Sequence, residues 1–203
     1  MPILKVSVCR KEEQLMWSSK GQTLIELVVV VTVIVIVVTA LTFATIASLR
    51  NSQFAKNQAQ ATKLAQEGIE RVRSGRDRNQ PIVSNGGLSG VSSWDGDISG
   101  LGTIWNYQIE GNCGNTTLTP PIFCYLNVDK EGVLNYLIAS SSFPQGAESI
   151  PVPPEKSQFR RVVILSDELP TFGSRKTVTV IVRWTDFAGD HESILKTILR
   201  KTQ

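Results

Sequence analysis

The sequence has a single histidine, His191, and only three cysteines among its 203 residues. A single histidine leaves few residues from which a histidine-based catalytic triad or a histidine-rich zinc site could be built. The sequence also contains no phosphate-binding glycine loop and no catalytic nucleophile motif. We accordingly expect no catalytic residues, no metal site and no cofactor. We expect His191 to be a solvated residue in a turn.

Charged residues are missing from Leu27 to Leu49, where most side chains are apolar. An apolar run of about 18 residues or more is typical of a membrane-spanning helix. A helix from Leu24 to Leu49 would be about 39 Å long at ~1.5 Å per residue, enough to cross a bilayer with some tilt. A cleavable secretory signal has an apolar region of only about 7–15 residues and a small-residue cleavage site. That alternative fits the run less well.

Basic residues flank the apolar run on both sides and define its orientation only weakly. The positive-inside rule counts Lys and Arg near the ends of a membrane helix. Here it favours, by a small margin, an N-terminus in the cytoplasm. The basic residues before the run are Lys5, Arg10, Lys11 and Lys20, and those after it are Arg50, Lys56 and Lys63.

Proline is absent between Pro2 and Pro81, so nothing forces the helix to stop where the apolar run ends. The following stretch is rich in Ala, Gln, Lys, Glu and Arg, which favour helices. We predict one helix from about Leu24 to about Ser74, with Gly75 as its stop. Its first half suits lipid, and its second half carries an apolar stripe for a protein partner. The stripe consists of Phe54, Ala61, Leu64, Ala65, Ile69 and Val72.

Strand-like segments follow a glycine-rich connection that spans residues 74 to 102. In residues 176–184 apolar and polar side chains alternate, as in a half-buried strand. Residues 129–132 and 186–190 read as turns, and residues 140–158 as a loop rich in Pro and Ser. A helix followed by four to six antiparallel strands is an α+β fold. The expected strands are residues 103–110, 122–128, 133–139, 159–165, 176–184 and 192–200.

The stretch KGQTLIEL, from Lys20 to Leu27, resembles the start of the type IV pilin superfamily. The family has a short basic leader, a glycine, an aromatic residue, then Thr-Leu-Ile-Glu and a long apolar helix. The resemblance implies that a prepilin peptidase cuts after Gly21 and methylates the new N-terminus at Gln22. It also implies that Thr23, Leu24, Ile25 and Glu26 serve in assembly. Two departures stand out, since Gln22 replaces the usual phenylalanine and Phe43 occupies the place of a frequent proline.

The resemblance also implies a domain organisation, partners and a location. Residues 1–21 would be the leader, 22–49 the transmembrane half of the helix, 50–75 its amphipathic half, and 76–203 an extracytoplasmic sheet domain. The partners would be other pilin subunits, the prepilin peptidase, a membrane assembly platform and, before assembly, lipid. The chain would sit in the cytoplasmic membrane and then in an extracytoplasmic filament of a pilus, secretion or DNA-uptake system.

Glu26 is a lone carboxylate inside the apolar region, with no basic residue close by in the sequence. A charge at bilayer depth costs about 2.5–3.5 kcal/mol on insertion scales, and less near an interface. One interpretation is an acid that reaches to the membrane edge and needs no partner. The resemblance implies another, in which cleavage creates an amine on Gln22 and Glu26 of one subunit faces that amine on a neighbour.

Several weaker signals lead to expectations for the remainder of the chain. Cys113 and Cys124 form an even pair once Cys9 is removed with the leader, and they are either bridged or free and buried. The sequence WDGD at residues 94–97 is interpreted as a turn rather than a calcium loop, and the sequon at residues 115–117 as a chance match. The basic residues 50–78 are interpreted as a solvated helix face, so a nucleic-acid partner is disfavoured.

Two hypotheses about function remain open from the sequence. The first is a structural pilin-like subunit that enters a filament, and AQEGIERVR at residues 65–73 favours a minor pilin within that class. The second is a single-pass membrane protein with an extracytoplasmic binding domain that never polymerises. The sequence does not separate major pilin, minor pilin and secretion pseudopilin.

Overall fold

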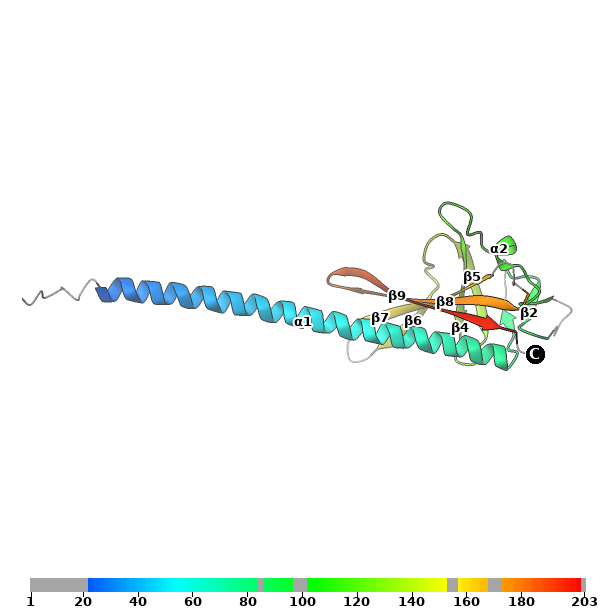
Figure 1. Cartoon of the computed structure of the whole chain (residues 1–203), viewed down its shortest axis with the longest axis horizontal. Coiled ribbons are helices and arrows are strands. Elements are labelled where there is room, and N and C mark those ends of the chain that lie inside the picture. The colour runs from blue at the N-terminus through cyan, green and yellow to red at the C-terminus, as the bar shows by residue number, and fades with distance from the viewer. Residues whose placement is uncertain (1–21, 84–85, 97–101, 153–156, 168–172, 202–203) are drawn as a thin grey trace, which may run out of the picture. The chain divides into compact units, whose positions relative to one another are not determined.

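The computed structural model describes residues 22–83, 86–96, 102–152, 157–167 and 173–201 (Figure 1). The leader predicted at residues 1–21 lies outside these described residues. The chain divides into two compact units, residues 1–52 and residues 53–203.

A single helix, α1 (Gln22–Asp77), contributes to both units. It starts close to the predicted Leu24 and ends after the predicted Ser74. Gly75 is inside the helix, because the reversal comes later at Asn79, whose φ of 49° is left-handed. Asparagine is one of the few residues besides glycine that adopt this conformation readily at a helix end. The N–H of Gln80 closes the end by donating to the carbonyl of Gly75 at 2.8 Å.

In the described residues that come after α1, the chain forms nine strands and one short helix. The main sheet has seven strands in the order β1-β5-β4-β7-β8-β9, with β6 also paired to β7, and a separate two-stranded sheet joins β2 and β3. Neighbours in the main sheet are antiparallel except β1 and β5. This confirms the predicted α+β class. The elements are β1 (Ile82–Val83), β2 (Val91–Ser93), β3 (Gly102–Thr103), α2 (Ile109–Asn112), β4 (Phe123–Val128), β5 (Leu134–Ser140), β6 (Glu148–Val152), β7 (Ser157–Asp167), β8 (Arg175–Asp186) and β9 (Gly189–Arg200).

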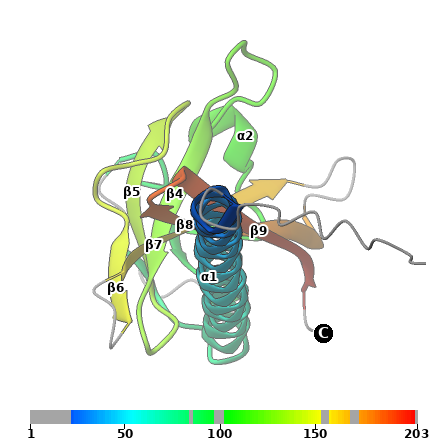
Figure 2. The same cartoon turned by 90° about the vertical axis from the view of Figure 1, so that its left-hand side faces the viewer.

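The second half of α1 (residues 53–77) packs on one face of the main sheet (Figure 2). Ala61, Ala65 and Val72 of the predicted stripe are fully buried, and Leu64 and Ile69 pack beside them. From the sheet, alternate residues of β8 meet them, as the alternation of residues 176–184 predicts. These are Val178, Val180, Val182 and Trp184, each at most 2% exposed.

Two glycines let the helix approach the sheet closely. A Cβ on Gly68 would lie 2.9 Å from Cγ1 of Val180, which is closer than Cβ atoms approach their neighbours in real structures. A Cβ on Gly75 would overlap the carbonyl oxygen of Gly132 in the β4–β5 turn, and Gly132 itself has a φ of +89°. Gly75 is therefore needed for contact of backbone with backbone rather than for stopping the helix.

A buried arginine joins the helix to the sheet. The Arg161 side chain on β7 is 1% exposed, and its guanidinium donates to Glu148 Oε2 at 2.6 Å and to the carbonyl of Leu64 at 3.0 Å. Glu148 belongs to β6, a strand that the sequence did not predict because it lies in the Pro- and Ser-rich loop. Pairing with β7 and this ion pair hold it in place.

The strand predicted at residues 103–110 is wrong. Ile104 and Trp105 are neighbours and are both fully buried, which the alternation of a strand does not allow in this half-exposed sheet. The chain instead turns after β3 and forms α2. The predicted irregular connection at residues 74–102 likewise contains β1 and β2.

Candidate functional site

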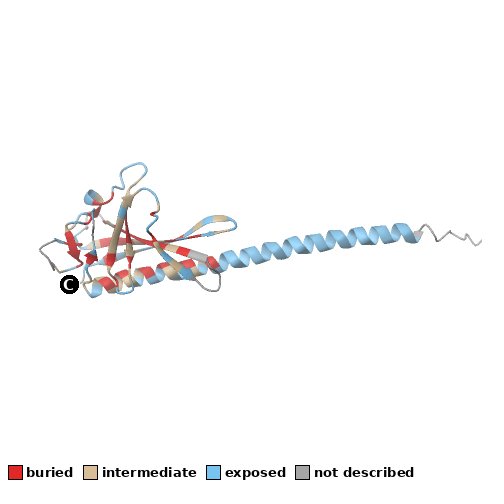
Figure 3. Cartoon of the chain, turned by 180° about the vertical axis from the view of Figure 1, so that it is seen from behind, coloured by how far each residue is buried: buried red, intermediate tan, exposed pale blue. Residues whose placement is uncertain are grey.

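The first half of α1 is an uncovered apolar surface. Every side chain that the structure describes between Thr23 and Lys56 is exposed in the isolated chain (Figure 3). The large apolar residues from Leu24 to Leu49 are 41–70% exposed, with Ile46 and Phe43 at the extremes. Water does not favour so much contiguous apolar surface on a soluble monomer. Among the described residues this is the one helix long and apolar enough to cross a membrane, with a mean hydropathy of 3.1 in its most apolar window.

Four threonines within this apolar half are hydrogen-bonded to the backbone of the helix itself. Hydroxyl groups of Thr32, Thr39 and Thr42 donate to the backbone carbonyls four residues earlier at 2.7–2.8 Å. Thr45 donates to the carbonyl three residues earlier at 2.8 Å. An unpaired donor in hydrocarbon costs several kcal/mol, and these bonds avoid that cost without a partner helix.

Glu26 is the one acidic side chain in this half of the helix, and it has no such internal partner. It is exposed, and within the described part of the chain it makes no hydrogen bond or ion pair. Gln22 is the first residue of α1 and lies one turn before Glu26. Helix geometry separates the two residues by about 6 Å along the axis at ~1.5 Å per residue. Thr23, Leu24 and Ile25 occupy the intervening turn, and Gly21 lies outside the described residues.

The cysteine pair is joined in the structure. Cys113 at the end of α2 and Cys124 in β4 form a disulfide with Cα atoms 5.6 Å apart. Both residues are buried, at 6% and 1% exposure. The bridge therefore fixes the end of α2 to strand β4 of the main sheet.

A second buried ion pair, which the sequence analysis missed, supports the same region. Lys176 Nζ lies 2.5 Å from Asp167 Oδ1 and donates to the carbonyl of Tyr107 at 2.7 Å. The other oxygen of Asp167 accepts the N–H of Glu110 at 3.2 Å. Burial lowers the pKa of Lys176, and the Asp167 carboxylate opposes that shift. The alternation along β8 places Lys176 on the same inward face as Val178. This pattern could have identified Lys176 as a buried residue from the sequence.

The expectation of a solvated His191 is wrong. His191 lies in β9, where its ring stacks on Trp184 with centroids 5.4 Å apart and meets Phe54 edge-on at 5.1 Å. Its Nε2 is 2.9 Å from Asp186 Oδ1. Burial tends to raise the pKa of Asp186, but N–H donors of Ala188 and Gly189 together with His191 hold it below the ordinary value.

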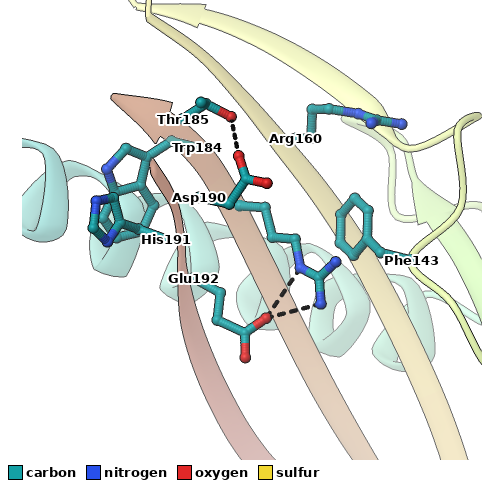
Figure 4. Close-up of a pocket in the computed structure, with 8 residues that line it drawn as sticks. Phe143, Arg160, Trp184, Thr185, Asp190, His191 and Glu192 are labelled. Carbon is teal, nitrogen blue, oxygen red and sulfur yellow. Dashed lines mark hydrogen bonds and ion pairs between the residues drawn. The ribbon is translucent and has the colours of Figure 1, made fainter. Parts of the chain in front are cut away.

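A pocket of about 560 Å³ opens beside His191 (Figure 4). Phe143 forms one wall, with the guanidinium carbons of Arg183 and Arg160 at 4.4 and 5.4 Å from its ring centre. Arg183 is paired with Glu192 at 3.0 Å, and Arg160 donates to two backbone carbonyls of the neighbouring loop. The charged groups that line the pocket thus have partners within the chain, so the pocket is assigned no ligand.

The remaining weak signals have local explanations. The N–H of Asp95 donates to the side-chain oxygen of Asn79 at 2.8 Å, which ties the segment after β2 to the end of α1. Asp97, the second acid of the sequence WDGD at residues 94–97, lies outside the described residues. Asn115 accepts from the N–H and the hydroxyl of Thr117 at 3.0 and 2.7 Å, which is an ordinary turn.

Comparison with protein-family models gives one match, the prokaryotic N-terminal methylation motif at residues 18–42. Comparisons with curated proteins and with solved structures give no significant match. The matched segment contains Gly21, Gln22 and Glu26 and most of the apolar run. It implies processing by a prepilin peptidase and assembly with other pilins, and the pilin-like family is structural and non-enzymatic. The motif, and a long apolar helix that continues onto a mostly antiparallel sheet, indicate a type IV pilin-like prepilin protein.

Proposed function

We propose that this chain is a structural subunit of a type IV pilus or of a related secretion or DNA-uptake filament. Prepilin peptidase removes residues 1–21 after Gly21 and methylates Gln22. Residues 22–49 anchor the subunit in the cytoplasmic membrane, with the leader on the cytoplasmic side, and later form part of the filament core. Residues 50–75 and 76–203 make up the extracytoplasmic head.

The observation that carries this proposal is the uncovered apolar helix that begins within the methylation motif. A membrane can cover that surface in a single subunit, and identical or homologous helices can cover it in a filament. The internal hydrogen bonds of its threonines suit both environments, because neither offers water as a partner. The assembly platform would move the helix from one environment to the other.

Glu26 gives the proposed assembly its register. Cleavage places a cationic amine on Gln22, at nearly the depth of Glu26. In a filament the carboxylate of one subunit meets the amine of a neighbour. At ~4 Å and an effective dielectric constant of ~20, that attraction is about 4 kcal/mol. This exceeds the insertion cost of about 2.5–3.5 kcal/mol for a central charge.

Immunogold labelling of cells that carry an epitope on the head tests the proposal. We expect gold along or at the tip of a filament that is lost when the peptidase gene is deleted. Labelling confined to the cell envelope in peptidase-positive cells would instead support a membrane-anchored protein that never polymerises. The position of the gold also separates a major from a minor subunit, since a minor pilin labels sparsely.

A further inference from the structure

Exposed aromatic side chains are rare in the head and lie at one end of it. Among the described residues from 53 to 203, only Phe54 and Phe187 combine an aromatic ring with high exposure, at 40% and 59%. The other exposed large apolar residues of this unit are aliphatic. Phe187 lies in the connection between β8 and β9, within residues 186–189, which we call the hairpin tip.

Contacts along β9 show which way the hairpin tip points. Near the end of β9, the carbonyl of Arg200 accepts from Arg76 Nη1 at 3.1 Å. Earlier in β9, Ser193 lies 3.3 Å from the hydroxyl of Thr62. At the start of the strand, His191 meets Phe54. From the end of β9 to its start, the contacts with α1 thus move from Arg76 through Thr62 to Phe54. The hairpin tip, which precedes β9, therefore lies at the Phe54 end of the helical segment 53–77.

Only a short length of chain separates Phe54 from the apolar run. Phe54 follows Leu49 by five residues, which span about 7.5 Å as a helix and at most about 18 Å when fully extended. Phe187 follows Trp184, the ring neighbour of Phe54, by three residues, about 10 Å of strand. The interfacial zone beyond the hydrocarbon is about 5–8 Å deep on each side, a depth comparable with the helical length from Leu49 to Phe54 and with the length of chain from Trp184 to Phe187.

We propose that the hairpin tip is a lipid-contacting element, with Phe187 inserted in the interfacial zone of the bilayer that holds residues 22–49. Aromatic rings are favoured at that depth. The proposal depends on the membrane anchoring described above, but it does not depend on filament assembly. It assigns the exposed ring to a lipid surface rather than to another subunit.

The charges at the tip indicate which lipids suit it. Asp186 is bonded to His191, and Asp190 accepts from the hydroxyl of Thr185 at 2.6 Å. Each acid therefore has a hydrogen-bond partner within the hairpin, while the second carboxylate oxygen of Asp186 is buried without one among the described residues. Both acids would oppose contact with an anionic surface. We therefore expect the contact to form on zwitterionic lipid, driven by burial of the aromatic ring.

Site-specific fluorescent labels on the full chain test this assignment. The thiol of Cys9 is removed as Cys9→Ser, and Cys113 and Cys124 are bridged. Single labels are placed by Phe187→Cys, by Ile138→Cys, which is a similarly exposed position on β5, and by Ile34→Cys in the apolar helix. The chain is reconstituted in phosphatidylcholine bilayers, with spin-labelled lipid as the membrane quencher and iodide as the aqueous quencher.

We expect the label at residue 187 to shift to shorter wavelength and to be quenched by spin-labelled lipid several-fold more than the label at residue 138. Iodide should show the reverse order. If the labels at 187 and 138 behave alike while the label at 34 is quenched by lipid, the lipid contact is refuted and membrane anchoring stands. If the label at residue 34 is also not quenched by spin-labelled lipid, both the lipid contact and the membrane anchoring are refuted. Protection of the 187 label only in assembled filaments would assign Phe187 to a neighbouring subunit and refute the lipid contact.

Discussion

Replacing Glu26 by glutamine separates insertion from assembly, because the two processes weigh its charge in opposite ways. Glutamine keeps the shape of the side chain and removes the charge. Insertion should become easier by up to about 2.5–3.5 kcal/mol, the cost of a central carboxylate, and less near the interface. Assembly loses the attraction to the Gln22 amine of a neighbour, about 4 kcal/mol at an effective dielectric constant of ~20. Near 1.4 kcal/mol per factor of ten, that loss is roughly a thousand-fold in association.

The assay compares membrane and filament fractions of cells that carry Glu26→Gln beside the other filament components. We expect wild-type amounts in the membrane fraction and almost none in sheared filaments. Thr32→Val is the matched control, since Thr32 is polar, lies in the same half of the helix and already donates to the carbonyl of Val28. It should be incorporated normally. Incorporation of Glu26→Gln at the level of the Thr32→Val control would refute the reasoning.

Three further predictions concern the head. Gly75→Ala forces a methyl group against the β4–β5 turn and should lower the free energy of unfolding by about 2 kcal/mol or more, measured by urea denaturation of a head fragment attached to a soluble fusion partner. Arg161→Ala removes the ion-pair partner of Glu148 and should lower the free energy of unfolding by about 3 kcal/mol in the same assay. Equal stability of the variant and the wild type would show that the Arg161–Glu148 ion pair is dispensable. Reduction of the Cys113–Cys124 bridge should lower stability by about 3 kcal/mol, and an unchanged midpoint with dithiothreitol would contradict that estimate.

The elements that the sequence predicts well are those with a strong local period. The apolar run is recognised by its length, the stripe of the helix follows a 3.6-residue period, and β8 follows a two-residue period with Val178, Val180 and Val182 all buried. These patterns identify the α+β class and the face of the helix that meets the sheet. The methylation motif adds the proposed processing and assembly residues, which no periodicity could reveal.

The features that the sequence did not predict depend on contacts between distant residues. β6 exists because Arg161 and the rest of β7 hold it, although its own sequence reads as a loop. Gly75 reads as a helix stop, yet its role is set by Gly132, far away in the chain. His191 reads as a turn residue until Trp184 is seen to lie against it.

The intact mass and N-terminal sequence of the chain from cells with an active prepilin peptidase test the central claim most directly. The account predicts a protein that begins at Gln22, carries one added methyl group on its α-amine and contains an intact disulfide. A single Gly21→Ala variant should keep its leader in the same cells. A wild-type chain that retains Met1 to Gly21 in peptidase-positive cells, or one cut at another bond, would contradict the account.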